Sequence, residues 1–186
     1  MAFACNDMGL MTTDQRWSQG ETIVRKKGFS LIELLIVVAI ILIIAAIAIP
    51  NLLRSRIAAN EASATATLRT INTAEITYSS TYNSGFTDTL TQLGTPASGQ
   101  PDANNADLVD PVLSGKTTGG ASRIFTKNGY SFTYAPSGTY GFIATFSLNA
   151  DPVARGSSGQ RSFFTDQSSV IRANATAGAT VSDNPI

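Results

Sequence analysis

One carboxylate stands in an otherwise uncharged segment near the N-terminus. Glu33 is the only charged residue between Phe29 and Ile49, and the 16 residues from Leu34 to Ile49 are all apolar. A carboxylate within a membrane helix costs on the order of 2.5 to 3.5 kcal/mol. Its presence therefore indicates a cationic partner, unless Glu33 lies close enough to the membrane interface to reach water.

The rest of the sequence offers little for catalysis or metal binding. It has no histidine and one cysteine, Cys5, which excludes imidazole metal sites, histidine-based catalysis and an internal disulfide. No recognisable Ser-x-x-Lys pair or phosphate-binding Gly-Lys loop occurs. Asp102, Asp107 and Asp110 lie close together but lack the spacing and central glycine of an EF-hand loop. We expect no enzymatic activity, no cofactor and no metal site.

Length and charge limit the remaining classes of protein. The chain has 186 residues, 43% of them hydrophobic, with 13 basic and 13 acidic residues. This length suits one ordinary domain with a real core. The balanced charge provides no broad basic face, so we expect no general nucleic-acid binding.

The apolar segment has the dimensions of a membrane span. As a helix, the 21 residues from Phe29 to Ile49 measure about 31 Å, which matches the apolar core of a bilayer. No polar stripe follows Glu33, unlike in a core helix. The basic residues before the segment, Arg25, Lys26 and Lys27, predict a cytoplasmic N-terminus. A secretory signal would have a shorter apolar region and a small-residue cleavage site.

Residues 26 to 50, KKGFSLIELLIVVAIILIIAAIAIP, resemble the N-terminal signature of type IV prepilins and the related type II secretion pseudopilins. The shared features are a basic pair, Gly28, Phe29, Glu33 four residues later, the apolar helix and Pro50, where we expect a kink or a helix end.

The resemblance implies a maturation and assembly pathway. A prepilin peptidase would recognise Arg25, Lys26, Lys27 and Gly28 and cleave after Gly28, and Phe29 would be N-methylated. Assembly would then use Phe29, Glu33 and Pro50, with the Phe29 ammonium of a neighbouring subunit as the partner of the Glu33 carboxylate.

The resemblance also implies an α+β fold, the type IV pilin fold, in which a long N-terminal helix with a membrane-spanning apolar half packs on a C-terminal antiparallel sheet. The expected parts are a cleaved leader (1–28), a transmembrane and polymerisation helix (29–50) and a globular domain (51–186). The domain would contain an amphipathic helix (51–82), a connecting loop (83–122), the sheet (123–175) and a tail (176–186).

The residue pattern of 51–82 independently predicts an amphipathic helix. Its apolar face would consist of Ile57, Ala64, Leu68, Ile71, Tyr78 and Tyr82. We expect the charged residues to form a solvated face, and the alternative is that they bridge neighbouring subunits. These residues are Arg54, Arg56, Glu61, Arg69 and Glu75.

Polar turn-forming residues dominate 83–122, which predicts a long loop. Strands are predicted at 123–127, 130–135, 139–148, 161–165 and 169–172, with a turn at 136–138. Alternating residues predict buried faces for two strands: Tyr130, Phe132 and Tyr134, then Phe142, Ala144 and Phe146. Residues 159–175 resemble the last strands of disulfide-free bacterial pilin-like proteins.

By resemblance, the chain is a structural subunit of a type IV pilus, in the inner membrane before assembly and then on the cell surface. The implied partners are copies of itself in a helical homopolymer, the prepilin peptidase, an assembly platform with its extension ATPase, a secretin and inner-membrane lipid. Most pilins close their C-terminal loop with two cysteines, which are absent after Cys5. A pseudopilin or minor pilin remains the alternative, and a signal-anchored exported enzyme or binding domain a remote one.

Overall fold

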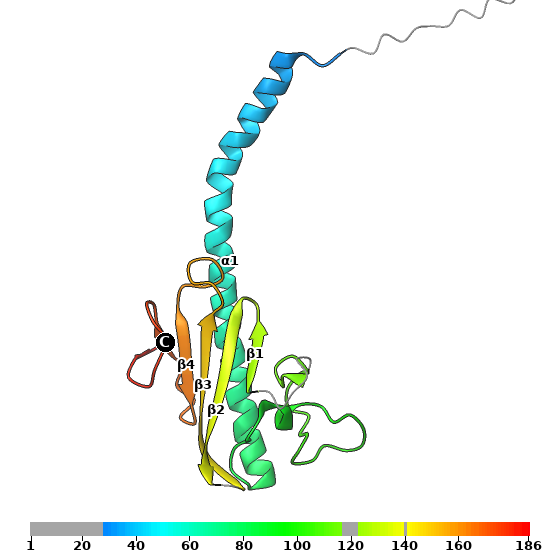
Figure 1. Ribbon diagram of the computed structural model, residues 1–186, viewed down its shortest axis with the longest axis vertical. Helices are drawn as coiled ribbons and strands as arrows, with labels where there is room; N and C mark the ends of the chain where they lie inside the picture. The colour runs from blue at the N-terminus through cyan, green and yellow to red at the C-terminus, as the bar shows by residue number, and fades with distance from the viewer. Residues whose placement is uncertain (1–27, 117–122, 140) are drawn as a thin grey trace, which may run out of the picture. The chain divides into compact units, whose positions relative to one another are not determined.

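The computed structural model describes residues 28–116, 123–139 and 141–186 (Figure 1). The described part divides between two compact units, one ending at Leu42 and the other running from Ile43 to Ile186. Helix α1, Leu31–Tyr82, contributes residues to both units, and every strand belongs to the second.

The apolar part of α1 is exposed in the described part of the chain. Apart from Glu33, every residue from Leu31 to Ile49 is apolar, and all but Ala45 are exposed. The helix is long and apolar enough to cross a membrane, and none of its apolar window is buried. Backbone hydrogen bonding inside the helix makes such a segment stable in lipid.

The second unit contains a six-stranded sheet in which every pair of neighbours is antiparallel. The strands, in sequence and in spatial order, are β1 (Ile124–Lys127), β2 (Tyr130–Thr139), β3 (Phe142–Pro152), β4 (Ser162–Asp166), β5 (Arg172–Asn174) and β6 (Asn184–Pro185). The two-residue connection Asn128–Gly129 joins β1 to β2 with positive φ at both positions, as a tight hairpin turn requires. The predicted α+β class with an antiparallel sheet is confirmed.

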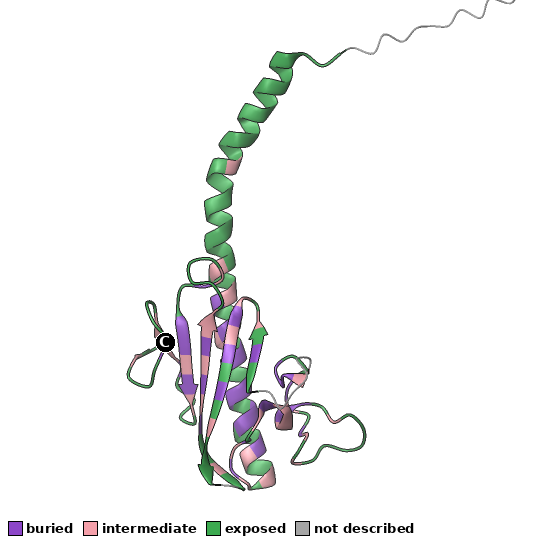
Figure 2. Cartoon of the chain, in the orientation of Figure 1, coloured by how far each residue is buried: buried purple, intermediate pink, exposed green. Residues whose placement is uncertain are grey.

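One hydrophobic core joins α1 to the sheet, and buried and exposed positions alternate along this part of the helix (Figure 2). The predicted helix face is confirmed, since Ala64, Leu68, Ile71 and Tyr78 are buried and Ile57 and Tyr82 are half-buried. The sheet contributes Tyr130, Phe132 and Tyr134, as predicted, and also Leu148, Ala150 and Phe163. Phe125 and Phe132 stack with ring centroids 4.5 Å apart.

Several details of the predicted sheet are wrong. The strand predicted at 139–148 lies at Phe142–Pro152, and the strand predicted at 169–172 lies at Arg172–Asn174. Residues 136–138 do not form a turn but continue β2, and Pro136 pairs with Phe146 before the register shifts between Ser137 and Gly138. An irregularity of this kind accommodates proline within a strand. Phe142 and Ala144 are exposed, because the buried alternation of β3 begins only at Phe146.

The segment after α1 is more ordered than a surface loop. It contains a 3₁₀ helix, η1, at Leu90–Leu93, and the backbone of Ala106, Leu108 and Val109 hydrogen-bonds to the η1 region. Its apolar residues are scattered in sequence, singly or in pairs, but five of them enter the core: Leu90, Leu93, Ala106, Val109 and Leu113. The prediction of a plain loop therefore missed part of the core.

Polar contacts hold the C-terminal segment in place. Part of the stretch expected to be a tail, 176–186, forms strand β6. The Arg155 guanidinium donates to the carbonyls of Ala175, at 3.0 Å, and Ala177, at 3.2 Å. The Asp183 carboxylate accepts from Asn174 Nδ2 at 2.9 Å and from the Thr180 backbone N–H at 2.6 Å.

Candidate assembly segment and the carboxylates of helix α1

Gly28, Phe29 and Ser30 precede α1 without regular structure. The first helical turn is closed by the Leu34 N–H, which donates to the Ser30 carbonyl at 3.2 Å. The side chain of Phe29 is 74% exposed. The bond proposed for cleavage thus lies immediately before the helix begins.

Glu33 lies in the first turn of α1 and is exposed. No hydrogen bond or ion pair to its carboxylate occurs within the described residues. The N-terminal end of a helix favours a negative charge. In the uncleaved chain Phe29 N is an amide, whereas cleavage after Gly28 would convert it into an ammonium.

Pro50 does not end the helix, because α1 continues through it to Tyr82. Proline has no N–H to donate to the carbonyl four residues earlier, which is that of Ala46. This point of the apolar segment therefore lacks one helical hydrogen bond and is weaker than the turns around it.

The described residues around Glu33 and Pro50 form a large exposed apolar surface. Its large side chains, from Phe29 to Leu53, are between 43% and 80% exposed. Monomeric soluble proteins rarely expose apolar patches beyond a few hundred Å². This segment requires a bilayer or other apolar helices around it.

Glu61 holds the loop between β3 and β4 against α1. One carboxylate oxygen, Oε1, accepts the backbone N–H groups of Gln160, at 2.9 Å, and Arg161, at 3.0 Å. The other, Oε2, accepts from Arg161 Nε at 2.9 Å. Partial burial raises the pKa of this carboxyl, but the backbone hydrogen bonds and the Arg161 guanidinium outweigh it and lower the pKa below its ordinary value.

Glu75 is completely buried near the C-terminal end of α1. It accepts the Thr87 hydroxyl at 2.6 Å and the Thr87 backbone N–H at 3.0 Å, and the Tyr134 hydroxyl donates to the Thr87 carbonyl at 2.8 Å. Among the described residues, no lysine or arginine forms an ion pair with it. Burial raises the pKa of Glu75 despite the hydrogen bonds from Thr87.

The prediction that Glu61 and Glu75 belong to a solvated face was wrong for both residues. Each lies seven positions from Leu68, which places the two carboxylates on the buried face of the helix. That spacing was the sequence signal for their burial. Arg54, Arg56 and Arg69, by contrast, are exposed as expected.

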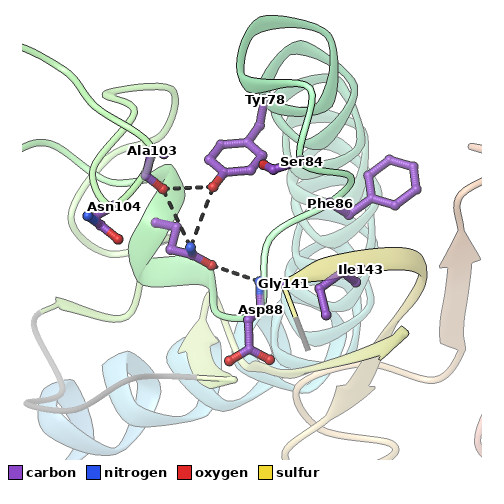
Figure 3. A pocket seen from close by; sticks show the side chains of 9 residues that line it. Tyr78, Ser84, Phe86, Asp88, Ala103, Asn104, Gly141 and Ile143 are labelled. Atoms are coloured by element: carbon purple, nitrogen blue, oxygen red, sulfur yellow. Dashed lines mark hydrogen bonds between the residues drawn. The ribbon is translucent and has the colours of Figure 1, made fainter. Parts of the chain in front are cut away.

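A cavity of about 460 Å³ lies between the end of α1, the segment after it and the β2–β3 connection (Figure 3). Its polar groups mostly bind one another. The Tyr78 hydroxyl donates to the Ala103 carbonyl at 2.7 Å, and Gln92 Oε1 accepts the Asp88 N–H at 2.7 Å. The Asp88 carboxylate is paired with Arg123 at 2.6 Å. We therefore attribute the cavity to the way the segment after α1 packs.

Two of the three aspartates considered for calcium, Asp102 and Asp110, have local roles in turns. Asp102 accepts the backbone N–H groups of Asn104 and Asn105, and Asp110 accepts that of Leu113. Within the described residues, no group of three or more acidic or cysteine side chains could hold a metal ion.

Two comparisons with known proteins concern the N-terminal region. Residues 23–49 match the family model of the prokaryotic N-terminal methylation motif. The type IV wide pilus major component PilA4 of Thermus thermophilus is 64% identical over 42 residues. The chain carries the N-terminal methylation motif of type IV prepilins. This motif includes Arg25, Lys26 and Lys27, which lie outside the described residues.

The likeness to the Thermus pilin covers 23% of this chain and 32% of that protein. The chain thus matches about a third of the length of this curated relative. No solved structure gives a significant match. The comparisons therefore identify the N-terminal motif, and the form of the globular part comes from the structure described here.

Proposed function

We propose that this chain is a structural subunit of a type IV pilus. The observation that carries the proposal is the N-terminal methylation motif at residues 23–49, together with the high identity to a major pilus component in the same region. The exposed apolar surface of α1 supports it, because that surface suits a bilayer before assembly and a bundle of identical helices afterwards. The role is structural and not enzymatic.

The methylation motif supports a proposed maturation pathway. Prepilin peptidase recognises Arg25, Lys26, Lys27 and Gly28 and cleaves between Gly28 and Phe29, leaving 1–28 as the leader. Phe29 then carries a methylated ammonium four residues from Glu33. The segment 29–50 is the membrane anchor and later the polymerisation helix, and 51–186 is the globular domain outside the cytoplasm.

Assembly pairs the Glu33 carboxylate with the Phe29 ammonium of a neighbouring copy. An unpaired charge in an apolar filament core is strongly destabilising, so the pair specifies the axial position of each incoming subunit. Pro50 weakens the helix where the incoming segment must adjust. The assembly platform, its extension ATPase and a secretin complete the pathway.

Peptide mass spectrometry of material sheared from the cell surface tests this proposal. We expect an abundant N-terminal peptide that begins at methylated Phe29. The same peptide confined to the envelope fraction supports the pseudopilin or minor-pilin alternative. An intact leader in all fractions contradicts the proposed maturation and supports an anchored domain.

A further inference from the structure

Three polar residues of α1 are held by two loops at the place where the helix meets the sheet. Glu61 binds the loop between β3 and β4 as described above. Asn60 Nδ2 donates to the Ser158 carbonyl at 2.7 Å, and Asn128 Nδ2, in the β1–β2 turn, donates to Ser63 Oγ at 2.7 Å. We call Asn60, Glu61 and Ser63 with these loop partners the polar collar.

The β3–β4 loop has a shape that suits this contact. Its backbone is closed on itself by the Gly156 N–H, which donates to the Gly159 carbonyl at 2.8 Å. Gly159 packs directly on the Tyr130 ring, and a Cβ there would lie 2.1 Å from the Tyr130 hydroxyl oxygen. That hydroxyl donates to the Arg161 carbonyl at 2.7 Å. The loop therefore presents the N–H groups of residues 160 and 161 to Glu61 from a fixed position.

Within the second unit, the two sides of the polar collar differ in how α1 is supported. On the N-terminal side, from Ile43 to Ala59, only Ala45 and Ile57 are partly buried, and Pro50 removes a helical hydrogen bond. On the C-terminal side, Ala64, Leu68 and Ile71 are buried in the core. Helical segments without tertiary packing are marginal in water, so opening is expected on the N-terminal side.

Opening that passed the polar collar would break several hydrogen bonds at once. Glu61 is only 8% exposed and accepts two backbone N–H groups and a guanidinium N–H. Hydrogen bonds to a charged group are stronger than those between neutral groups, so opening at this point would break three of the stronger contacts of the helix. We propose that the polar collar is a latch that stops helix opening on its N-terminal side from spreading into the buried face.

This latch concerns the folded subunit and does not depend on the proposed function in a filament. Hydrogen–deuterium exchange by mass spectrometry of the full chain in detergent micelles tests it. We expect rapid exchange at amides 51–59 and slow exchange from 60 onward. In Glu61→Ala, amides 61–68 should exchange about tenfold faster or more, while those of β2 and β3 stay protected.

The substitution is informative because alanine has the higher intrinsic helix propensity, which by itself predicts slower exchange. Arg161→Ala retains the two backbone hydrogen bonds to Glu61 and should give a smaller increase. Arg69→Ala, on the exposed face of the same helix, is the matched control and should leave exchange at 61–68 unchanged.

Two results would overturn the proposal. One is unchanged exchange at 61–68 in Glu61→Ala with the sheet still protected. The other is loss of protection in β2 and β3 together with 61–68 in both Glu61→Ala and Arg161→Ala, because the contact would then belong to global unfolding and not to a local latch.

Discussion

The two halves of α1 are stabilised by different surroundings. The half that follows the polar collar buries Leu68 and Ile71 completely against the sheet. The apolar half exposes nearly all of its side chains, including Leu42 at 63%. The C-terminal half is therefore specified by contacts within the chain, whereas the apolar N-terminal half requires lipid or other copies of the helix to cover it.

The three glutamates of α1 show the same contrast. Glu61 and Glu75 have partners within the domain, Arg161 and Thr87 respectively. Glu33 has none in the described part of the chain and lies in the half that needs other molecules. Glu61 and Glu75 are thus bound within the folded domain, and under our proposal Glu33 is the carboxylate left for a contact between subunits.

The largest expected effect tests this division at Glu33. We expect Glu33→Leu to enter the membrane and to be cleaved, yet to lower the yield of sheared filaments about tenfold or more, because the neighbouring ammonium would be left unpaired. Immunoblots of sheared and envelope fractions measure the yield and the cleavage.

Glu33→Asp, which keeps the charge on a shorter side chain, is the matched control and should recover part of the yield. Unfolding of the domain by urea should be the same in all three proteins. Normal filament yield in Glu33→Leu would contradict the proposed ion pair. It would also contradict the distinction between Glu33 and the two glutamates that have partners within the domain.

The second prediction compares one leucine from each half. Leu68→Ala should lower the free energy of unfolding of the domain by about 2–5 kcal/mol, through lost burial and the cavity left behind. Leu42→Ala should change it by less than about 0.5 kcal/mol. Urea titration of the full chain in mild detergent, followed by near-ultraviolet circular dichroism, measures both. A comparable loss in the two variants would contradict the contrast between the halves.

The smallest effect is a pH dependence at Glu75. Burial raises its folded pKa above the ordinary value of 4.5, so the unfolded chain loses this proton first as the pH rises. The stability contribution is complete below about pH 4.5 and is lost as the pH rises through the folded pKa. Glu75→Gln cannot ionise and should become more stable relative to wild type over that window, by at most about 1.4 kcal/mol per pH unit.

Glu61→Gln is the control for the direction in which stability changes with pH. Glu61 has a lowered folded pKa, so wild type loses its contribution as the pH falls below 4.5. This variant should therefore lose stability relative to wild type as the pH rises from the folded pKa of Glu61 toward 4.5. Unfolding curves for the two variants that run parallel to wild type at every pH would contradict the assignment of the carboxylates.

Long-range regularities made much of the fold predictable from the sequence. The uninterrupted apolar segment and the spacing of Ala64, Leu68 and Ile71 each have a single structural explanation, a helix with one or more apolar faces. Alternation in Tyr130, Phe132 and Tyr134 similarly predicted a strand. Pro136 and Gly138 misled the prediction, because the same residues that form turns also occur at irregular points inside strands.

The site was predictable only where its residues are neighbours in sequence. The N-terminal motif, with Gly28, Phe29 and Glu33, is a local pattern and could be recognised directly. Glu61 binds residues about 100 positions later, and no local pattern gives that pairing. The core residues between 83 and 116 were missed because they occur singly or in pairs among polar and turn-forming residues, without a helical or strand period.

The fastening of the C-terminal segment by Arg155 and Asp183 has a consequence for where the protein can fold. No cysteine occurs after Cys5, so closure of this segment requires no thiol oxidation. Folding of the domain is therefore independent of a disulfide-forming enzyme in the compartment that receives it. Reducing agents leave the closure intact, whereas acid weakens it, because hydrogen bonds from the Thr180 backbone and neighbouring donors lower the pKa of Asp183 and favour its ionised form.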